Sequence, residues 1–267
     1  GRTGVTEKRT YWNAEVYDKI GTPMRGWARQ VIDDLSLKGD ETVLDAGCGS
    51  GSVTLDLWQK VKDGKIYALD TSPDMINKLH ATLAERGIEN IIPMQADLTR
   101  FTLNEQVDVV FSNAVFHWIQ DDAGLFGSLA RATKSGGRLR AQCGGGENNR
   151  KLMTATRDVE KRIPYAEHLS GRVDSRKYRT EQQAVEALQR NGWKNARANL
   201  FPSPVVFDDV DSAVLYLKTI ILQQQASALP EELSEQFLRD VIDEVIIRHG
   251  VPFVADYVRL DLWAERA

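Results

Sequence analysis

Three glycines at alternate positions, Gly47, Gly49 and Gly51, follow directly on a short apolar segment that ends at Ala46. Glycine is needed where the backbone must turn tightly or approach a ligand directly. Because a helical pattern begins straight after them, the stretch predicts a strand, a glycine turn and the N-terminus of a helix. A unit of this kind can bind a nucleotide-like cofactor that carries an anionic group.

The spacing of the glycines and the acid that precedes them indicate which class of cofactor the turn would bind. A dinucleotide motif places its third glycine one position later, where Ser52 stands, which disfavours a nicotinamide dinucleotide. Asp45 lies two residues before the first glycine. A carboxylate there would repel a pyrophosphate and attract an ammonium or sulfonium group. A nicotinamide oxidoreductase stays an alternative, and it predicts that the chain binds NAD.

Three more polar segments follow apolar segments that are typical of strands. Asp70 ends the strand predicted over 65–69, Asp97 follows the strand over 91–94, and Asn113 follows the strand over 107–111. The carboxyl ends of neighbouring parallel strands share one edge of the sheet, where open α/β sheets bind ligands. Asp70 is therefore expected to border the glycine turn and to accept ribose hydroxyls, and Asp97 to accept an adenine amino proton.

From residue 40 onward, strand and helix patterns alternate, which predicts an α/β fold with a doubly wound, mostly parallel sheet. Further strands are expected at 42–46, 138–142, 196–201 and 257–264, with a turn at 142–146. Residues 11–38 predict an N-terminal helical cap, 40–145 the cofactor-binding core, and 209–250 amphipathic helices inserted before the last strand. The inserted helices form either a substrate lid or a stabilising flap. All of these parts are assigned to one domain over residues 1–267.

Composition narrows the classes of partner. The formal net charge of −4 offers no general basic field for nucleic acid or for an anionic membrane, and no apolar run is long enough to span a bilayer. The basic run at 172–179 is mixed with an acid and predicts a solvated loop. Two cysteines and four scattered histidines give neither a disulfide framework nor metal-ligand spacing. We expect a cytoplasmic protein without a metal; its oligomeric state is not predicted.

Together, the motifs V-L-D-A-G-C-G-S-G, A-L-D-T-S and Q-A-D-L resemble those of the class I S-adenosylmethionine-dependent methyltransferases, over residues 40–145 or so. The resemblance implies S-adenosylmethionine as cofactor and a seven-stranded sheet whose last strand is antiparallel. It also implies that Asp45 lies at the methionine end of the cofactor, Asp70 at the ribose and Asp97 at the adenine. The cofactor-binding residues so predicted are Tyr17, Trp27, Asp45, Ala46, Gly47, Cys48, Gly49, Gly51, Asp70, Thr71, Met75, Ala96, Asp97, Leu98, Asn113 and Ala114. For Met75, ordinary helix core is the alternative.

The segment S-N-A-V-F-H-W-I most resembles the trans-aconitate methyltransferase group, which methylates carboxyl oxygens of small molecules. The resemblance makes a small-molecule methyl acceptor the expected partner, with Tyr11, Trp12, His117 and Trp118 as candidate substrate-binding residues. His117 is also the candidate catalytic residue, either as a base or as a donor that holds a carboxylate, unless it only bonds within its own loop. A carboxylate acceptor needs no base, whereas a hydroxyl or carbon acid usually does.

Other functions stay open on the sequence alone. Methylation of carbon or of another oxygen of a small metabolite is the second choice, and a non-catalytic partner subunit that binds S-adenosylmethionine is an alternative of another class. Nucleobase amino-methyltransferases resemble families with paired prolines after the fourth strand, and residues 112–115 contain no proline.

Overall fold

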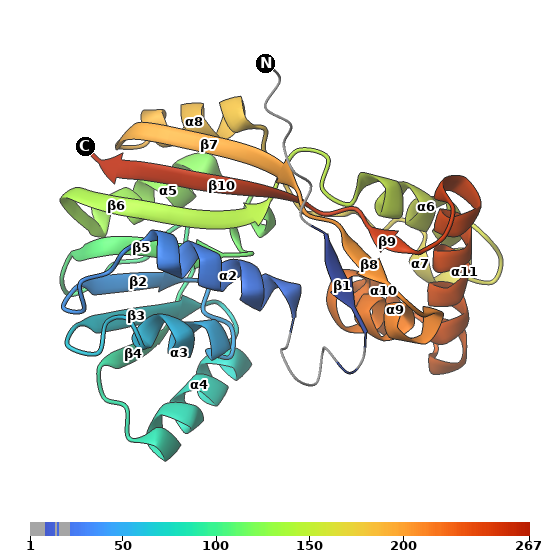
Figure 1. Ribbon diagram of the computed structural model, residues 1–267, viewed down its shortest axis with the longest axis horizontal. Coiled ribbons are helices and arrows are strands. Elements are labelled where there is room, and N and C mark those ends of the chain that lie inside the picture. The colour runs from blue at the N-terminus through green and yellow to red at the C-terminus, as the bar shows by residue number, and fades with distance from the viewer. Residues whose placement is uncertain (1–8, 14, 16–21) are drawn as a thin grey trace. The chain divides into compact units, whose positions relative to one another are not determined.

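The computed structural model describes residues 9–13, 15 and 22–267, which divide into two compact units. The sheet unit comprises residues 24–146, 175–200 and 259–267. The helical unit comprises the described residues up to 23 together with 147–174 and 201–258. Both units are thus assembled from interleaved segments of the chain that was predicted as one domain (Figure 1).

A seven-stranded sheet in the order β4-β3-β2-β5-β6-β10-β7 forms the sheet unit. The strands are β2 (Thr42–Ala46), β3 (Lys65–Asp70), β4 (Ile91–Gln95), β5 (Val107–Asn113), β6 (Thr133–Gly144), β7 (Trp193–Pro202) and β10 (Val258–Arg266). The strands from β4 to β6 pair in parallel, whereas β10 pairs antiparallel with β6. This topology confirms the predicted doubly wound sheet with an antiparallel last strand.

Helices cover both faces of this sheet because its buried strands carry apolar side chains on both sides. On one face, α2 (Pro23–Asp34), α3 (Ser52–Trp58) and α4 (Pro73–Arg86) share a core with Val43 and Val109. On the other, α5 (Asp122–Arg131) and α8 (Glu181–Arg190) share a core with Leu44 and Val110 (Figure 1). The parallel arrangement brings the carboxyl ends of β2, β3, β4 and β5 to one edge.

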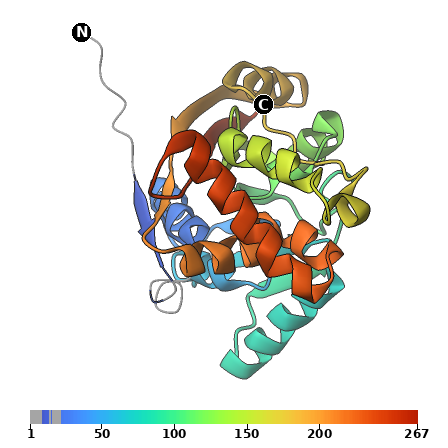
Figure 2. The ribbon, with the colours of Figure 1, turned by 90° about the vertical axis from the view of Figure 1, so that its right-hand side faces the viewer.

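The helical unit packs α11 (Glu231–His249) along α6 (Arg150–Glu160), as Figure 2 shows. Its other elements are α7 (Ala166–Leu169), α9 (Val210–Tyr216), the π-helical turn η2 (Leu217–Ile221), α10 (Gln223–Ala228), β1 (Thr10–Trp12), β8 (Val205–Phe207) and β9 (Val254–Ala255). The predicted inserted helices are therefore present, and their role as a lid stays a prediction. Across the described residues, no helix is both long enough and apolar enough to cross a membrane.

Two local predictions are wrong. Tyr11 and Trp12 were expected in a helical cap, but they lie in β1, which pairs in parallel with β8. The later part of the predicted cap is helical, as α2. Aromatic residues suit a strand once a partner strand is available, and that partner lies almost two hundred residues away at 205–207. Gln142 to Gly144, expected in a turn, continue β6 because β10 pairs with it.

Candidate functional site

The glycine turn after β2 has the backbone conformation that the sequence predicts. Gly47, Gly49 and Gly51 all have positive φ angles, of 90°, 54° and 101°. The amides of Gly47 and Cys48 both donate to the carbonyl of Leu69, at 2.8 and 2.9 Å, which fastens the turn to β3. Residues with a Cβ rarely adopt such angles, so glycine is required here.

The carboxylate of Asp70 borders this turn, as predicted. Its Oδ2 accepts the amide hydrogen of Gly49 at 3.0 Å, and its Oδ1 accepts that of Ser72 at 2.9 Å. A carboxylate has about four lone-pair positions, so two amide donors leave capacity for hydroxyl donors. The side chain is half-exposed and can therefore reach a ligand.

Asp45 is a buried acid at the end of β2, only 2% exposed. Burial raises the pKa of this carboxyl to about 7; the hydroxyl of Thr54, which donates to Oδ2 at 2.7 Å, opposes that rise, and the nearby charge of Asp70 adds to it. A buried carboxylate of this kind is stabilised by a cation placed beside it. The residue type and its position thus suit a positively charged ligand group.

The end of β5 carries an unsatisfied acceptor and a strained backbone. The amide nitrogen of Asn113 donates to the carbonyl of Met24 at 3.2 Å, but its buried Oδ1 has no hydrogen-bond partner in the described part of the chain. Ala114 has a φ of 63°, a conformation that costs free energy for any residue with a Cβ, and its amide donates to the carbonyl of Gln142 at 2.7 Å. This buried acceptor can therefore receive a hydrogen bond from a bound ligand.

The remaining predicted cofactor residues differ in their surroundings. Asp97 is exposed, and the amide and hydroxyl of Thr99 donate to it at 2.9 and 2.7 Å, which lowers the pKa of its carboxyl. Met75 is half-buried and does not belong to the buried stripe of α4, so it is not ordinary helix core. The side chain of Leu98 does belong to the core beside α5.

Four other predicted residues also lie at or just beyond the carboxyl ends of β2, β3 and β4. Ala46 is buried and its carbonyl accepts the hydroxyl of Ser112 at 2.7 Å, and Cys48 is buried with the pKa of its thiol raised by burial. The exposed Thr71 and the half-buried Ala96 lie directly after β3 and β4. Tyr17 lies outside the described residues.

His117 sits in the short 3₁₀ helix η1 (Phe116–Trp118), next to the strained end of β5. Its ring is buried, and Nδ1 accepts the amide hydrogen of Gly144 at 3.0 Å. Its carbonyl accepts the amide hydrogen of Lys177 at 2.6 Å. The imidazole is therefore held from β6, and the backbone of His117 from the segment 175–179.

The predicted solvated loop at 172–179 is wrong for its second half. Arg179 is 1% exposed, and its guanidinium donates to the carbonyls of Phe116 and Ile119, at 2.9 and 2.7 Å, and to Asp122 at 2.8 Å. Each bond anchors the loop that carries His117. The sequence of this segment shows only its charge and its mixed composition. Neither indicates which arginine side chain is hydrogen-bonded to buried acceptors.

Segment 175–179 also brings cationic and aromatic groups to His117. The guanidinium of Arg176 lies 5.5 Å from the ring centre of Trp118 and 6.0 Å from that of Tyr178. The Tyr178 and Trp118 rings lie 6.0 and 5.5 Å from the imidazole of His117. The sequence analysis predicted Trp118 and missed Arg176 and Tyr178.

The predicted aromatic residues of the N-terminal segment fall into different units. Trp27 is buried in the sheet unit, with the guanidinium of Arg259 at 4.5 Å from its ring centre. Tyr11 and Trp12 belong to the helical unit, where Trp12 packs edge-on against Tyr216 and Tyr11 is exposed. Their roles in binding stay predictions. The described residues contain no group of three potential ligands placed to hold a metal ion.

Comparison with known proteins agrees with this geometry. Residues 43–137 match the family model described as a methyltransferase domain. The chain is 26% identical to a trans-aconitate 2-methyltransferase of Azoarcus sp. over 85% of its own length and 86% of the relative's. It is 33% identical to a malonyl-[acyl-carrier protein] O-methyltransferase of Acetivibrio thermocellus, over 48% of this chain and less than half, 44%, of that protein. The crystal structure of YcgJ from Bacillus subtilis aligns with a TM-score of 0.63 at 14% identity, covering 90% of this chain and 98% of YcgJ.

Residues 43–137 therefore form a methyltransferase domain, similar to that of the class I S-adenosylmethionine-dependent methyltransferases. These matches confirm the predicted resemblance, and with it the cofactor, S-adenosylmethionine. The residues of the site fit this cofactor. Asn113 Oδ1 and Asp45 offer a buried acceptor and a buried acid to an ammonium group, and Asp70 offers lone pairs to hydroxyls.

Alanine substitutions at Gly47 and Gly49 are expected to differ in effect. The first should lower folding stability, and the second should mainly weaken cofactor binding. A Cβ on Gly47 would lie 2.3 Å from Cγ2 of Val115, so Gly47→Ala should lower the free energy of unfolding by about 1–3 kcal/mol. A Cβ on Gly49 meets no atom within 4 Å, so its stability cost is limited to the strain of its positive φ, about 1 kcal/mol. The new methyl group would project into the open space of the site and weaken S-adenosylmethionine binding.

Urea unfolding and calorimetric titration with S-adenosylmethionine measure the two effects. A Gly49→Ala variant that binds the cofactor as tightly as the parent protein would show that the space beside Gly49 is not used by the ligand.

Proposed function

We propose that this methyltransferase transfers the methyl group of S-adenosylmethionine to a carboxylate oxygen of a small organic acid. The names of the relatives support this acceptor, because trans-aconitate and malonyl groups both carry carboxylates. The chain is 26% and 33% identical to these two relatives over the aligned segments.

The hydrogen bond from Gly144 to His117 is the observation that carries the proposal. Because Nδ1 accepts an amide hydrogen, the neutral imidazole has its own proton on Nε2 and can only donate there. A general base needs a lone pair directed at the substrate, and the bond to Gly144 occupies the Nδ1 lone pair. A donor suits a carboxylate, which is already ionised near neutral pH and has no proton to lose.

The other residues of the site then have defined tasks. S-adenosylmethionine supplies a methyl group on a sulfonium, which is open to in-line displacement by an oxygen nucleophile. We assign the ammonium end to Asp45 and Asn113, the ribose to Asp70 and the adenine to Asp97. The glycine turn, with Ala46, Cys48, Thr71, Met75 and Ala96, encloses the cofactor.

His117 and Arg176 would orient the acceptor by donating to its carboxylate oxygens. Guanidinium groups bind carboxylates in a fixed planar geometry, and the rings of Trp118 and Tyr178 lie beside the guanidinium of Arg176. The enzyme holds the acceptor oxygen against the methyl group, so the reaction no longer depends on two molecules meeting in the right orientation in solution. This positioning is the main contribution of the enzyme to the rate.

Substitutions of His117 test the proposal. Glutamine places an amide donor within the reach of Nε2 and has no basic nitrogen, whereas alanine provides neither. We expect His117→Gln to keep turnover within about tenfold of the parent enzyme and His117→Ala to lose about 10–100-fold in kcat/KM, the value of a hydrogen bond to a charged group. Both variants lose the acceptor for the Gly144 amide, so that defect cancels in the comparison.

Initial rates are measured as transfer of labelled methyl groups from S-adenosylmethionine to a panel of small carboxylic acids. A methyl ester product releases its label as methanol in mild alkali. Alkali-stable product, together with equal inactivity of both His117 variants, would instead identify His117 as a base and the acceptor as a hydroxyl or carbon acid.

A further inference from the structure

The buried guanidinium of Arg259 links helix α2 to the end of β6, inside the sheet unit. Arg259 is the second residue of β10 and is only 1% exposed. Its guanidinium lies 4.5 Å from the ring centre of Trp27 on α2, and its Nε donates to Oε1 of Gln142 on β6 at 3.3 Å. Because a contact between a cation and an aromatic ring is strengthened when water is excluded, we expect this one to hold α2 against the sheet.

The carboxamide of Gln142 is fixed in the orientation that this contact needs. Its Nε2 donates to Oδ1 of Asp261 at 2.8 Å, so its Oε1 faces the guanidinium of Arg259. Asp261 also accepts from Arg140 at 2.9 Å, and Arg140 donates in turn to Asp34 at 2.7 Å. The two buried arginines of this ladder are thus balanced by two carboxylates. Such a network needs no added ion, which suits a fixed structural link rather than a ligand site.

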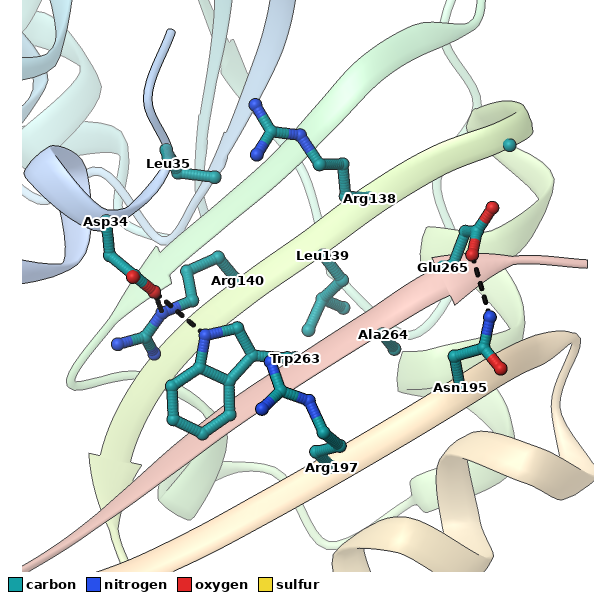
Figure 3. A pocket seen from close by; sticks show the side chains of 11 residues that line it. Asp34, Leu35, Arg138, Leu139, Arg140, Asn195, Arg197, Trp263, Ala264 and Glu265 are labelled. Atoms are coloured by element: carbon teal, nitrogen blue, oxygen red, sulfur yellow. Dashed lines mark hydrogen bonds and ion pairs between the residues drawn. The ribbon is translucent and has the colours of Figure 1, made fainter.

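Helix α2 is held on the sheet at both of its ends. Near its start, the carbonyl of Met24 accepts the side-chain amide hydrogen of Asn113 at 3.2 Å, one turn before Trp27. At its end, the last residue, Asp34, accepts from Nε of Arg140 (Figure 3). Trp27 and Asp34 are seven residues apart in the helix, a distance of about 10 Å. The guanidinium on Trp27 therefore fixes the first turns of α2, and Arg140 fixes the last.

The elements that Arg259 joins carry groups of the methyl-transfer site. Asn113 pairs in the strand register with Gln142, the residue that accepts from Arg259. Arg259 itself pairs with Gly144, whose amide donates to Nδ1 of His117. Asn113 also has a buried Oδ1 without a hydrogen-bond partner among the residues that the structure describes. A shift of α2 on the sheet would move this oxygen, because the same carboxamide is bonded to the first turn of α2.

We propose that Arg259 is a positioning residue for methyl transfer, which fixes the first turns of α2 so that Oδ1 of Asn113 is directed at the ammonium group of S-adenosylmethionine. This inference rests on the assignment of that ammonium group to Asp45 and Asn113 under the proposed function. Arg259 is buried and acts through Trp27 and Gln142, without contact to the cofactor. An acceptor that is already held in place binds its ligand more tightly, because less conformational freedom is lost on binding.

Two thioether ligands separate the amino-acid end of the cofactor from its nucleoside end. S-adenosylhomocysteine carries the ammonium group, whereas 5′-methylthioadenosine has the same nucleoside and sulfur without the amino-acid part. Calorimetric titration of the full chain with each ligand gives the ratio of their Kd values. We expect Arg259→Met, which keeps most of the buried stem, to raise the Kd of S-adenosylhomocysteine by about tenfold or more and that of 5′-methylthioadenosine by about twofold or less.

Arg140→Met is the matched control, because it removes the other buried arginine of the ladder, which bonds the far end of α2. It should lower the temperature of unfolding and leave the ratio of the two Kd values unchanged. Arg259→Lys is the milder variant, which keeps the charge. Lysine has no planar group to stack on Trp27 while it bonds Gln142, so the same selective loss is expected to a smaller degree. Thermal unfolding gives a temperature at which every variant is folded for the titrations.

Asn113→Ala tests the route through which Arg259 acts. Alone it should weaken S-adenosylhomocysteine selectively, and adding Arg259→Met should then cause little further loss, because both changes affect the same hydrogen bond.

Four results would overturn the proposal. They are unchanged affinities in Arg259→Met, equal losses for both ligands in that variant, the same selective loss in Arg140→Met, and losses that add in the double variant. Unchanged affinities in Asn113→Ala would refute the assignment of the ammonium group and, with it, this inference. The titrations involve no turnover, so none of these results affects the proposed carboxylate acceptor.

Discussion

Arg179→Met is expected to lower the free energy of unfolding by about 2–5 kcal/mol, a larger effect than that of any exposed arginine. Methionine keeps most of the buried apolar volume of the arginine stem but donates no hydrogen bond. The carbonyls of Phe116 and Ile119 would then be left without their guanidinium donor, and each buried acceptor so abandoned costs about 1–3 kcal/mol. Asp122 would lose its shorter ion pair, at 2.7 Å from Arg179.

Lys177→Met is the matched control for this variant. Lys177 contacts the same Asp122, at 3.1 Å, but the side chain is about one-third exposed, so its loss should cost at most about 1 kcal/mol. The backbone bond from Lys177 to the carbonyl of His117 is unaffected by either change. Urea unfolding followed by circular dichroism compares them, and equal stabilities would show that the buried arginine does not anchor the loop.

The cofactor side of the site could be predicted because its signals are local. Gly47, Gly49 and Gly51 need their positive φ angles whatever the rest of the chain does. Asp70 reaches the turn because adjacent parallel strands end together, and the bond between Asp70 and the amide of Gly49 is the result. A motif and a rule of sheet topology are therefore sufficient to bring these residues together.

The surroundings of His117 depend on partners that are distant in sequence. Gly144, which fixes the imidazole, and Arg179, which anchors its loop, lie 27 and 63 residues from the groups that they bond. No periodicity or composition distinguishes Arg179, which is buried, from Arg172, which is exposed. The same applies to Trp12, whose strand forms only because residues 205–207 pair with it. Such features require the tertiary structure, because local propensity does not contain them.

In the cofactor-free protein, Asp45 is expected to contribute stability that is lost as the pH rises from about 4 to about 8, and Asp45→Asn should remove this contribution. The pKa of Asp45 is raised to about 7 by burial, whereas an aspartate in the unfolded chain titrates near 3.9. The folded state therefore holds a proton that the unfolded state releases. The contribution of this proton is complete below pH 4 or so and is lost as the pH rises through about 7.

The size of this effect is large for one side chain. Each pKa unit corresponds to about 1.4 kcal/mol, so the difference in unfolding free energy between the parent protein and Asp45→Asn should change by several kcal/mol over that range. Asparagine keeps the shape of the side chain and an oxygen that can accept from the hydroxyl of Thr54. Urea unfolding of both proteins at a series of pH values gives the difference directly, and parallel curves would mean that Asp45 is ionised throughout.

We proposed that the ammonium group of S-adenosylmethionine lies beside Asp45, and a cation there favours the ionised form of the carboxyl, so cofactor binding should offset the loss of stability. The affinity of the parent protein should therefore increase as the pH rises through about 7, with release of a proton on binding below that pH. Calorimetry in two buffers of different ionisation enthalpy measures the proton released. Asp45→Asn should bind more weakly and release no proton from this position, so a parent protein whose affinity and proton release match those of the variant would place the ammonium group elsewhere.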